Sequence, residues 1–108
     1  MKTWVFSVHN VLCPPAEGCT TASMRAMLTN VSNKGGKVII WTGGDYVPEW
    51  ARELADVVCH KPDLPPGDVR EMCFVDSDEY ILRAMLRMGA SGTILASSLS
   101  VCPVEFTG

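Results

Sequence analysis

The feature that most constrains the fold of this chain is the alternation of short apolar runs with segments of helical periodicity. Five runs have the length and composition of buried strands: residues 4–6, 37–41, 56–59, 72–75 and 93–96. Helical patterns separate them, except for a loop between the third and the fourth run. Such alternation implies a parallel sheet with helices on both faces. We therefore predict an α/β, Rossmann-like three-layer fold with a parallel five-stranded sheet.

The helical segments show the spacing of one apolar face. In the first segment, apolar residues recur at i, i+3, i+4 and i+7, and the sequence N-K-G-G at residues 33–36 ends the helix. In the last segment, Gly89 is predicted to end the helix. The apolar faces of these two segments consist of Met24, Met27, Leu28 and Val31, and of Ile81, Leu82, Met85 and Leu86. A shorter helix near Trp50 is predicted between them, with Asp45 as its cap and Pro48 in its first turn.

Length and composition exclude several classes of protein. The 108 residues suit one domain, 1–108, with a core over about residues 3–96 and an irregular tail at 97–108. The 47% of apolar residues excludes disorder, and no apolar run approaches the ~18 residues of a membrane span. The net charge of −3, without a Lys/Arg-rich block, argues against broad nucleic-acid binding. The first residues lack the apolar core of a signal peptide, so a cytoplasmic location is expected.

The five cysteines indicate reduced thiols and not a disulfide framework. Their number is odd, and no C-x-x-C spacing occurs. A zinc site remains an alternative, with ligands drawn from Cys13, Cys59, His9 and His60, although no pair has zinc-finger spacing.

Polar residues follow four of the predicted strands. In parallel sheets the functional crevice lies at the carboxyl ends of the strands. The glycines after the second strand also leave backbone N–H groups able to approach an anion, although Thr-Gly-Gly is common in ordinary loops. In chain order, the strand exits carry Ser7 and His9, Thr42 and Gly43, Lys61, and Asp76 and Asp78.

The order of these four motifs resembles the haloacid dehalogenase-like (HAD) phosphohydrolase superfamily, and most closely the 3′-phosphatase domains of phage-type polynucleotide kinases. That family has the motifs hhhDxDxT/V, hhhT/S, a lysine often followed by proline, and hhhDD. The matching stretches are V-F-S-V-H-N-V-L at 5–12, I-I-W-T-G at 39–43, Lys61-Pro62, and C-F-V-D-S at 73–77. The resemblance covers roughly residues 3 to 96 and implies a minimal HAD-like fold without a cap insert.

The departures from the family pattern concern its catalytic residues. Ser7 stands where the family has its nucleophilic aspartate, and His9 stands where it has the aspartate that acts as general acid and base. Of the carboxylates that hold Mg²⁺ in the family, Asp76 is in place, while Asp78 comes one position late. Thr42 and Lys61, which hold the phosphate in the family, are retained.

These substitutions imply a catalytically degenerate HAD-like protein, a pseudophosphatase, and the expectation leans away from an enzyme. We expect a binding or inhibitory module, as in a phage accessory protein that binds a host protein in the host cytoplasm. The partner is a protein, or a phosphorylated ligand held by Thr42, Gly43 and Lys61. No cofactor is expected, and Mg²⁺ is the expected metal if any is bound. Trp50 is the predicted interface anchor.

Three alternatives remain open. The first is an active Mg²⁺-dependent phosphatase that uses Asp76 and Asp78 as relocated ligands and acts on a phosphomonoester or a nucleic-acid 3′-phosphate. The second is a Ser7–His9 hydrolase, for which no orienting carboxylate is evident. The third is that Ser7 and His9 were introduced to trap a substrate complex.

Overall fold

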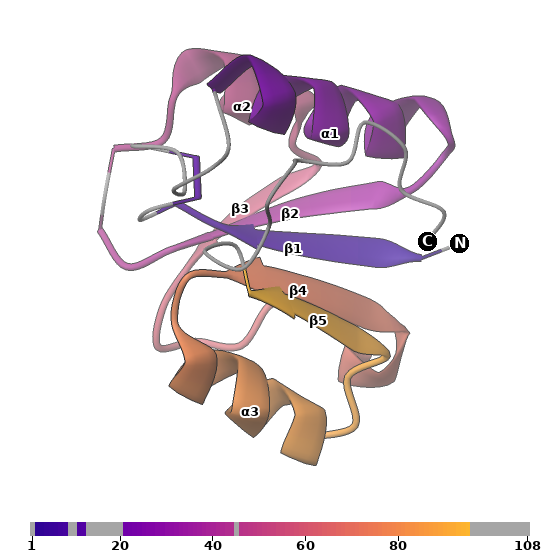
Figure 1. Cartoon of the computed structure of the whole chain (residues 1–108), viewed down its shortest axis with the longest axis vertical. Coiled ribbons are helices and arrows are strands. Elements are labelled where there is room, and N and C mark those ends of the chain that lie inside the picture. The colour runs from indigo at the N-terminus through magenta and orange to yellow at the C-terminus, as the bar shows by residue number, and fades with distance from the viewer. Residues whose placement is uncertain (1, 9–10, 13–20, 45, 96–108) are drawn as a thin grey trace.

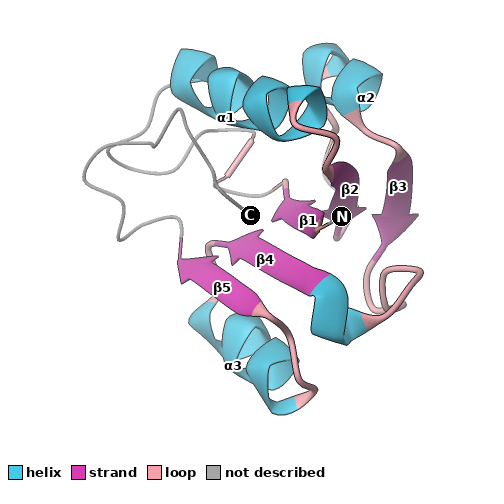
Figure 2. Cartoon of the chain, turned by 90° about the vertical axis from the view of Figure 1, so that its right-hand side faces the viewer, coloured by secondary structure: helices cyan, strands magenta, loops and turns pink. Residues whose placement is uncertain are grey.

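Five parallel strands form one sheet in the order β3-β2-β1-β4-β5 (Figure 1). The computed structural model describes residues 2–8, 11–12, 21–44 and 46–95. The elements in chain order are β1 (Thr3–Ser7), α1 (Thr21–Asn33), β2 (Lys37–Thr42), α2 (Glu49–Leu54), β3 (Val57–His60), the 3-10 turn η1 (Val69–Glu71), β4 (Met72–Asp76), α3 (Glu79–Arg87) and β5 (Gly92–Leu95). Helices α1 and α2 cover one face and α3 covers the other (Figures 1 and 2). The predicted α/β, Rossmann-like fold is confirmed.

The three central strands are those with the most continuous apolar sequence. Strand β1 pairs with β2 on one side and with β4 on the other, so that Val5 lies opposite both Ile39 and Phe74. Almost every residue of these strands is buried, whereas β3 and β5, at the sheet edges, are only partly buried. A strand covered on both faces needs apolar side chains in both directions, which explains the unbroken apolar runs.

Side-chain alternation along the strands divides the core into two layers. On the α1–α2 side, Phe6 and Ile40 pack against a helix stripe that includes Met27 and Leu28. On the α3 side, the core comprises Val5, Ile39, Trp41, Met72, Phe74, Leu82 and Met85. The predicted helix faces therefore pack on the sheet with one exception, and the side chain of Met24 lies outside the described part. Leu86 was predicted to face the core but is 49% exposed, because it lies one residue, about 100° around the helix, past the buried Met85. Odd-numbered residues of β1 and β2 point towards α3. Ser7 and Trp41, at the ends of these strands, therefore lie on the α3 side of the sheet.

The helix boundaries depend on local capping. Asp78 caps α3, because its carboxylate accepts a hydrogen bond of 2.9 Å from the backbone N–H of Tyr80. Gly89 follows α3 with φ of 96°, a left-handed conformation that glycine adopts without strain. Helix α2 begins at Glu49 with Pro48 as its N-cap, so Pro48 precedes the first turn instead of lying within it as predicted. The predicted cap Asp45 lies outside the described residues.

The three helices of the described residues are short. Helix α1 has 13 residues, α3 has 9 and α2 has 6. A bilayer crossing needs about 20 apolar residues, and no helix in the described ranges is long and apolar enough for that. The predicted interface anchor, Trp50, is only partly exposed, and it packs against the core on the α1–α2 side.

Candidate functional site

The candidate site lies where the chain reverses its direction across the sheet. From β1 the chain adds β2 and β3 on one side, and it then returns to place β4 on the other side of β1. Ligand sites of open α/β sheets lie at such a switch point, outside the carboxyl ends of the strands. Ser7 ends β1 and Asp76 ends β4, and each residue is only 3% exposed. Two buried polar side chains therefore meet at the switch point.

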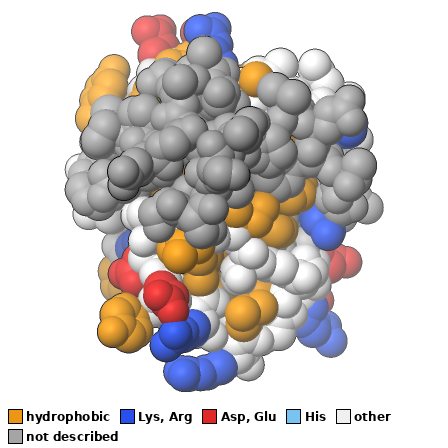
Figure 3. Space-filling model, in the orientation of Figure 1, with side chains coloured by type: hydrophobic (Ala, Val, Ile, Leu, Met, Phe, Trp, Pro, Cys, Tyr) orange, Lys and Arg blue, Asp and Glu red, His pale blue; other side chains and the backbone are white. Residues whose placement is uncertain are grey.

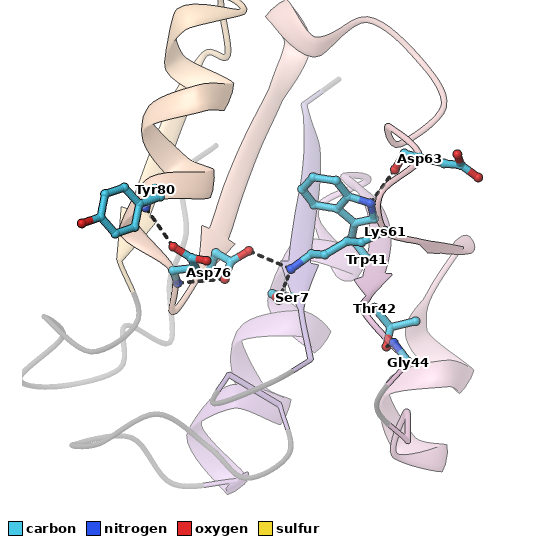
Figure 4. Close-up of polar contacts among 9 residues, drawn as sticks. Ser7, Trp41, Thr42, Gly44, Lys61, Asp63, Asp76 and Tyr80 are labelled. Carbon is cyan, nitrogen blue, oxygen red and sulfur yellow. Dashed lines mark hydrogen bonds and ion pairs between the residues drawn. The ribbon is translucent and has the colours of Figure 1, made fainter.

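Lys61 joins these two side chains. Its Nζ donates hydrogen bonds to Ser7 Oγ at 3.0 Å and to Asp76 Oδ2 at 3.2 Å (Figure 4). The ammonium also lies 5.0 Å from the ring centroid of Trp41, within the range of a cation–π contact. The lysine leaves the edge strand β3, so its side chain extends over β2 to reach β1 and β4. Side chains from three other strands, β1, β2 and β4, are thus gathered around the Lys61 ammonium.

Two hydrogen bonds fix the start of the loop that carries Lys61. The Lys61 N–H donates to the Thr42 carbonyl at 2.8 Å, which extends the pairing of β2 with β3 by one residue. The indole Nε1 of Trp41 donates to the Asp63 carbonyl at 2.7 Å. The Trp41 ring also packs edge-on against Phe74, with centroids 5.8 Å apart. The lysine is therefore held by neighbours that belong to the core.

The charges at the site balance each other. Asp76 accepts a hydrogen bond from the Asp78 N–H at 3.0 Å through Oδ1, and from Lys61 through Oδ2. The Asp76 side chain is 5% exposed and that of Lys61 is 22% exposed. A buried carboxylate is stable only with a counter-charge and hydrogen-bond donors. Lys61 supplies the charge, and the start of α3 supplies a second donor.

This geometry determines what Ser7 can do. A serine nucleophile needs a neighbouring base that takes its proton. The Lys61 ammonium donates to Ser7 and is held by Asp76, so it has no lone pair with which to accept that proton. The predicted partner of Ser7, His9, lies outside the described residues. Within the described residues, Ser7 accepts a hydrogen bond from the Lys61 ammonium.

Thr42, a predicted companion of Lys61 in phosphate binding together with Gly43, lies apart from the Lys61 ammonium (Figure 4). The side chain of Thr42 points to the opposite face of the sheet from that of Trp41. Its Oγ1 accepts a hydrogen bond of 3.2 Å from the Gly44 N–H. A side chain added at Gly43 would meet the stem of Lys61 at 3.9 Å. The phosphate-binding role of these residues stays a prediction.

The described residues do not fit a magnesium ion. Magnesium needs an octahedron of oxygen ligands that includes one or two carboxylates. Asp76 is already paired with Lys61, and Asp78 uses its carboxylate to cap α3. Within the described ranges, no three His, Cys, Asp or Glu side chains are placed to hold a metal ion.

The predicted zinc site is likewise not formed by His, Cys, Asp and Glu side chains of the described ranges. Cys59 and His60 lie at the end of β3, whereas Cys13 and His9 are outside the described residues. Burial, together with the negative charge of Asp63, raises the pKa of the Cys59 thiol, which disfavours the thiolate form that zinc binds.

Sequence reasoning grouped the right strand exits but missed the contacts among them. It assigned Lys61 to an anion, while in the structure the lysine binds Ser7 and Asp76. It also missed Trp41 as the surface beneath the ammonium. The odd-numbered positions of Ser7, Trp41 and Lys61 could have predicted that these side chains lie together. Side-chain alternation along the strands places those of Ser7 and Trp41 on the α3 side of the sheet.

No family model, curated protein or solved structure matches this chain.

Proposed function

We propose that this chain is a HAD-like domain that has lost phosphoryl transfer and that acts as a binding module for a protein partner. The observation that carries the proposal is the contact of Lys61 with Ser7 and Asp76. It brings three of the four motif positions together at the switch point of a sheet ordered 3-2-1-4-5. A phage origin and a host partner, which the resemblance implies, stay predictions.

The chemistry of the site supports the absence of turnover. Phosphoryl transfer in the HAD family starts from a carboxylate nucleophile, and here the position holds the hydroxyl of Ser7. Loss of a covalent nucleophile typically lowers kcat by many orders of magnitude. Asp76 is the remaining carboxylate of the family pattern, and Lys61 neutralises its charge. A site of this composition lacks both the nucleophile and the free negative charge that would hold a metal.

The surface around the site favours a protein partner over a phosphorylated ligand. Several exposed residues follow shortly after strand ends, and we call them the strand-exit surface: Tyr46, Glu49, Asp63, Glu79 and Tyr80. Three of the five are acidic. Glu79 is paired with Arg83 one turn further along α3, so Glu49 and Asp63 supply the negative charge that would repel an anionic ligand. Tyr46 and Tyr80 are 75% and 80% exposed. Exposed tyrosines are enriched at protein interfaces and at their hot spots.

The charge of the strand-exit surface indicates the chemistry of the partner. Asp63 and Tyr80 point outward on opposite sides of the Lys61 contact (Figure 4). On the face shown in Figure 3, acidic, basic and apolar side chains are interspersed over the region of α3. A protein segment with Lys or Arg side chains would complement the acidic groups, and its apolar atoms would pack on the tyrosines. We therefore propose a basic segment of a protein as the occupant.

The catalytic part of the proposal is tested by hydrolysis of a generic phosphomonoester with Mg²⁺. The wild-type chain is compared with a Ser7→Asp/His9→Asp variant and with a matched Ser7→Ala/His9→Ala control. We expect turnover only from the aspartate variant. Metal-dependent turnover by the wild type would overturn the proposal in favour of an active phosphatase with relocated ligands. If all three proteins are inert, restoring the two aspartates does not restore catalysis, and the proposed HAD-like assignment is no longer supported beyond the α/β fold itself.

The binding part is tested with two probes, a Lys/Arg-rich peptide and inorganic phosphate. The variant Tyr46→Ser/Tyr80→Ser should weaken peptide binding about tenfold, as expected for hot-spot tyrosines. The control Leu86→Ser/Met88→Ser changes two side chains that are 49% and 46% exposed. These two residues lie at the opposite end of α3, so the control should bind the peptide like the wild type. Binding of phosphate but not of the peptide would instead favour the phosphorylated ligand.

A further inference from the structure

A cavity of about 380 Å³ opens at the amino ends of the strands. It is lined by Ser32, Gly35, Gly36, Lys37 and Asp56. The turn from α1 into β2 lies at this end of the molecule, away from the strand exits (Figure 1). Its volume falls within the range of small-molecule sites in proteins. The cavity is therefore a candidate binding site separate from the Lys61 contact.

The carboxyl end of α1 forms one wall of this cavity with backbone. The Gly36 N–H donates to the Val31 carbonyl at 3.0 Å, and the Gly35 N–H donates to the Ser32 carbonyl at 3.1 Å. Gly35 has φ of 79°, and a Cβ at this position would meet no atom within 4 Å. The two glycines thus end the helix without a side chain that fills the space, and the helix end contributes a partial negative charge.

Asp56 contributes a fixed carboxylate with one oxygen in use. Its Oδ2 accepts a hydrogen bond of 2.8 Å from the Val38 N–H, while its own N–H donates to the Val38 carbonyl at 2.8 Å. These two bonds join the start of β3 to β2 and hold the side chain in place. In the part of the chain that the structure describes, no donor is bonded to Oδ1. One carboxylate oxygen is therefore left for a ligand.

Lys37 adds a positive charge to the same cavity. Within the described ranges, neither Lys37 nor Asp56 forms an ion pair, with each other or with another residue. A ligand with a single negative charge would be repelled by Asp56, and one with a single positive charge would be repelled by Lys37. A ligand that carries both charges would be attracted to both residues.

We propose that this cavity binds a small zwitterion of the amino-acid type, with its ammonium on the Asp56 carboxylate and its carboxylate on the Lys37 ammonium. The partial negative charge at the end of α1 favours the ammonium further. This inference goes beyond the proposed function and does not depend on it, because the strand-exit surface lies at the other end of the strands.

The experiment follows backbone amide signals by two-dimensional NMR while a probe is added to the wild-type chain. The probes are three zwitterions of increasing charge separation, glycine, β-alanine and γ-aminobutyrate, and two ligands of single charge, methylamine and acetate. We expect at least one zwitterion to give saturable shifts of the amides of Gly35, Gly36 and Asp56. Its Kd should be lower than that of either singly charged probe by about tenfold, the gain from one additional charge-assisted hydrogen bond.

Charge variants test the two assigned contacts. Asp56→Asn keeps an oxygen for the Val38 N–H, and Lys37→Met keeps an apolar stem, so each variant removes mainly a charge. Each should raise the Kd of the bound zwitterion about tenfold. The controls Glu53→Gln and Lys34→Met remove exposed charges of residues that do not line the cavity, and they should bind like the wild type.

Three results would overturn the proposal. They are the absence of saturable shifts with every zwitterion, equally tight binding of methylamine or acetate, and an unchanged Kd in both charge variants. Should a charge variant fail to fold, Ser32→Phe decides, because its ring would fill the cavity and abolish binding without changing a charge. The amides of Tyr46 and Tyr80 should not shift in any titration, so the outcome is separable from that of the peptide test of the proposed function.

Discussion

The Lys61 ammonium lies 3.2 Å from the Asp76 carboxylate, although the two residues leave the sheet from strands that are not neighbours. Strands β2 and β1 lie between β3, which precedes Lys61, and β4, which ends at Asp76. The lysine side chain spans this distance over the Trp41 ring and contacts Ser7 of β1 on the way. The contact therefore ties the edge of the sheet to its centre at the strand exits.

The first prediction is that removing Lys61 destabilises the fold more than neutralising Asp76. Lys61→Met leaves a buried carboxylate without its counter-charge. We expect a loss of about 2–3 kcal/mol in the free energy of unfolding, below the usual range for a broken buried pair because Lys61 is partly exposed. Asp76→Asn should cost about 1 kcal/mol, because the amide oxygen still accepts from Asp78 N–H. Urea denaturation measures both values, and a larger cost for Asp76→Asn would contradict this account.

The second prediction concerns Trp41 and the start of the loop after β3. Trp41→Phe removes the hydrogen bond of 2.7 Å from the indole to the Asp63 carbonyl. It should cost more than the ~1 kcal/mol of the lost hydrogen bond alone, because the smaller ring also leaves a cavity in the core, and it should open the loop more often. The amide of Asp63, which donates to the His60 carbonyl at 3.1 Å, should exchange with deuterium faster. Trp50→Phe is the control, and equal exchange rates in both variants would show that the indole does not anchor the loop.

The third prediction is an alkaline loss of stability caused by Cys73. Burial raises the pKa of the Cys73 thiol from 9.0 to about 11, against a smaller opposing effect of Lys2. Between these values the unfolded chain loses a proton that the folded chain keeps, so stability falls as pH rises. The full effect of this one group is about 2–3 kcal/mol. Cys73→Ala should remove that part of the slope in denaturation measured from pH 9 to 11, and identical slopes for the two proteins would count against the assignment.

The fourth prediction contrasts two glycines that flank β2. A Cβ at Gly36 would lie 2.9 Å from Val31 Cγ1 and 3.0 Å from the Val31 carbonyl oxygen. Because backbone must move, Gly36→Ala should cost about 1–3 kcal/mol and lower the Tm by several degrees. Gly43→Ala meets only the flexible Lys61 stem at 3.9 Å and should be neutral. Thermal unfolding of both variants tests this, and a neutral Gly36→Ala would show that the turn before β2 adjusts freely.

The sequence by itself determined the order and type of the elements and the edge of the sheet that carries the polar residues. Unbroken apolar runs identify strands buried on both faces, and their alternation with helical segments requires parallel pairing. Parallel strands bring their carboxyl ends to one edge, so Ser7, Thr42, Lys61 and Asp76 were predicted to share it. Local chemistry also predicted the end of the last helix at Gly89, because capping depends only on neighbouring residues.

Only the tertiary structure decided which of these polar groups touch. Hydrophobic patterning shows that a strand is buried, but it does not specify its neighbours or the path of a long side chain at its exit. The order 3-2-1-4-5 places Ser7 beside Asp76, and the Trp41 ring leads the Lys61 ammonium towards both. Sequence reasoning therefore assigned Lys61 to an external anion. In the folded chain a buried carboxylate is the nearer counter-charge, and long-range packing alone creates that proximity.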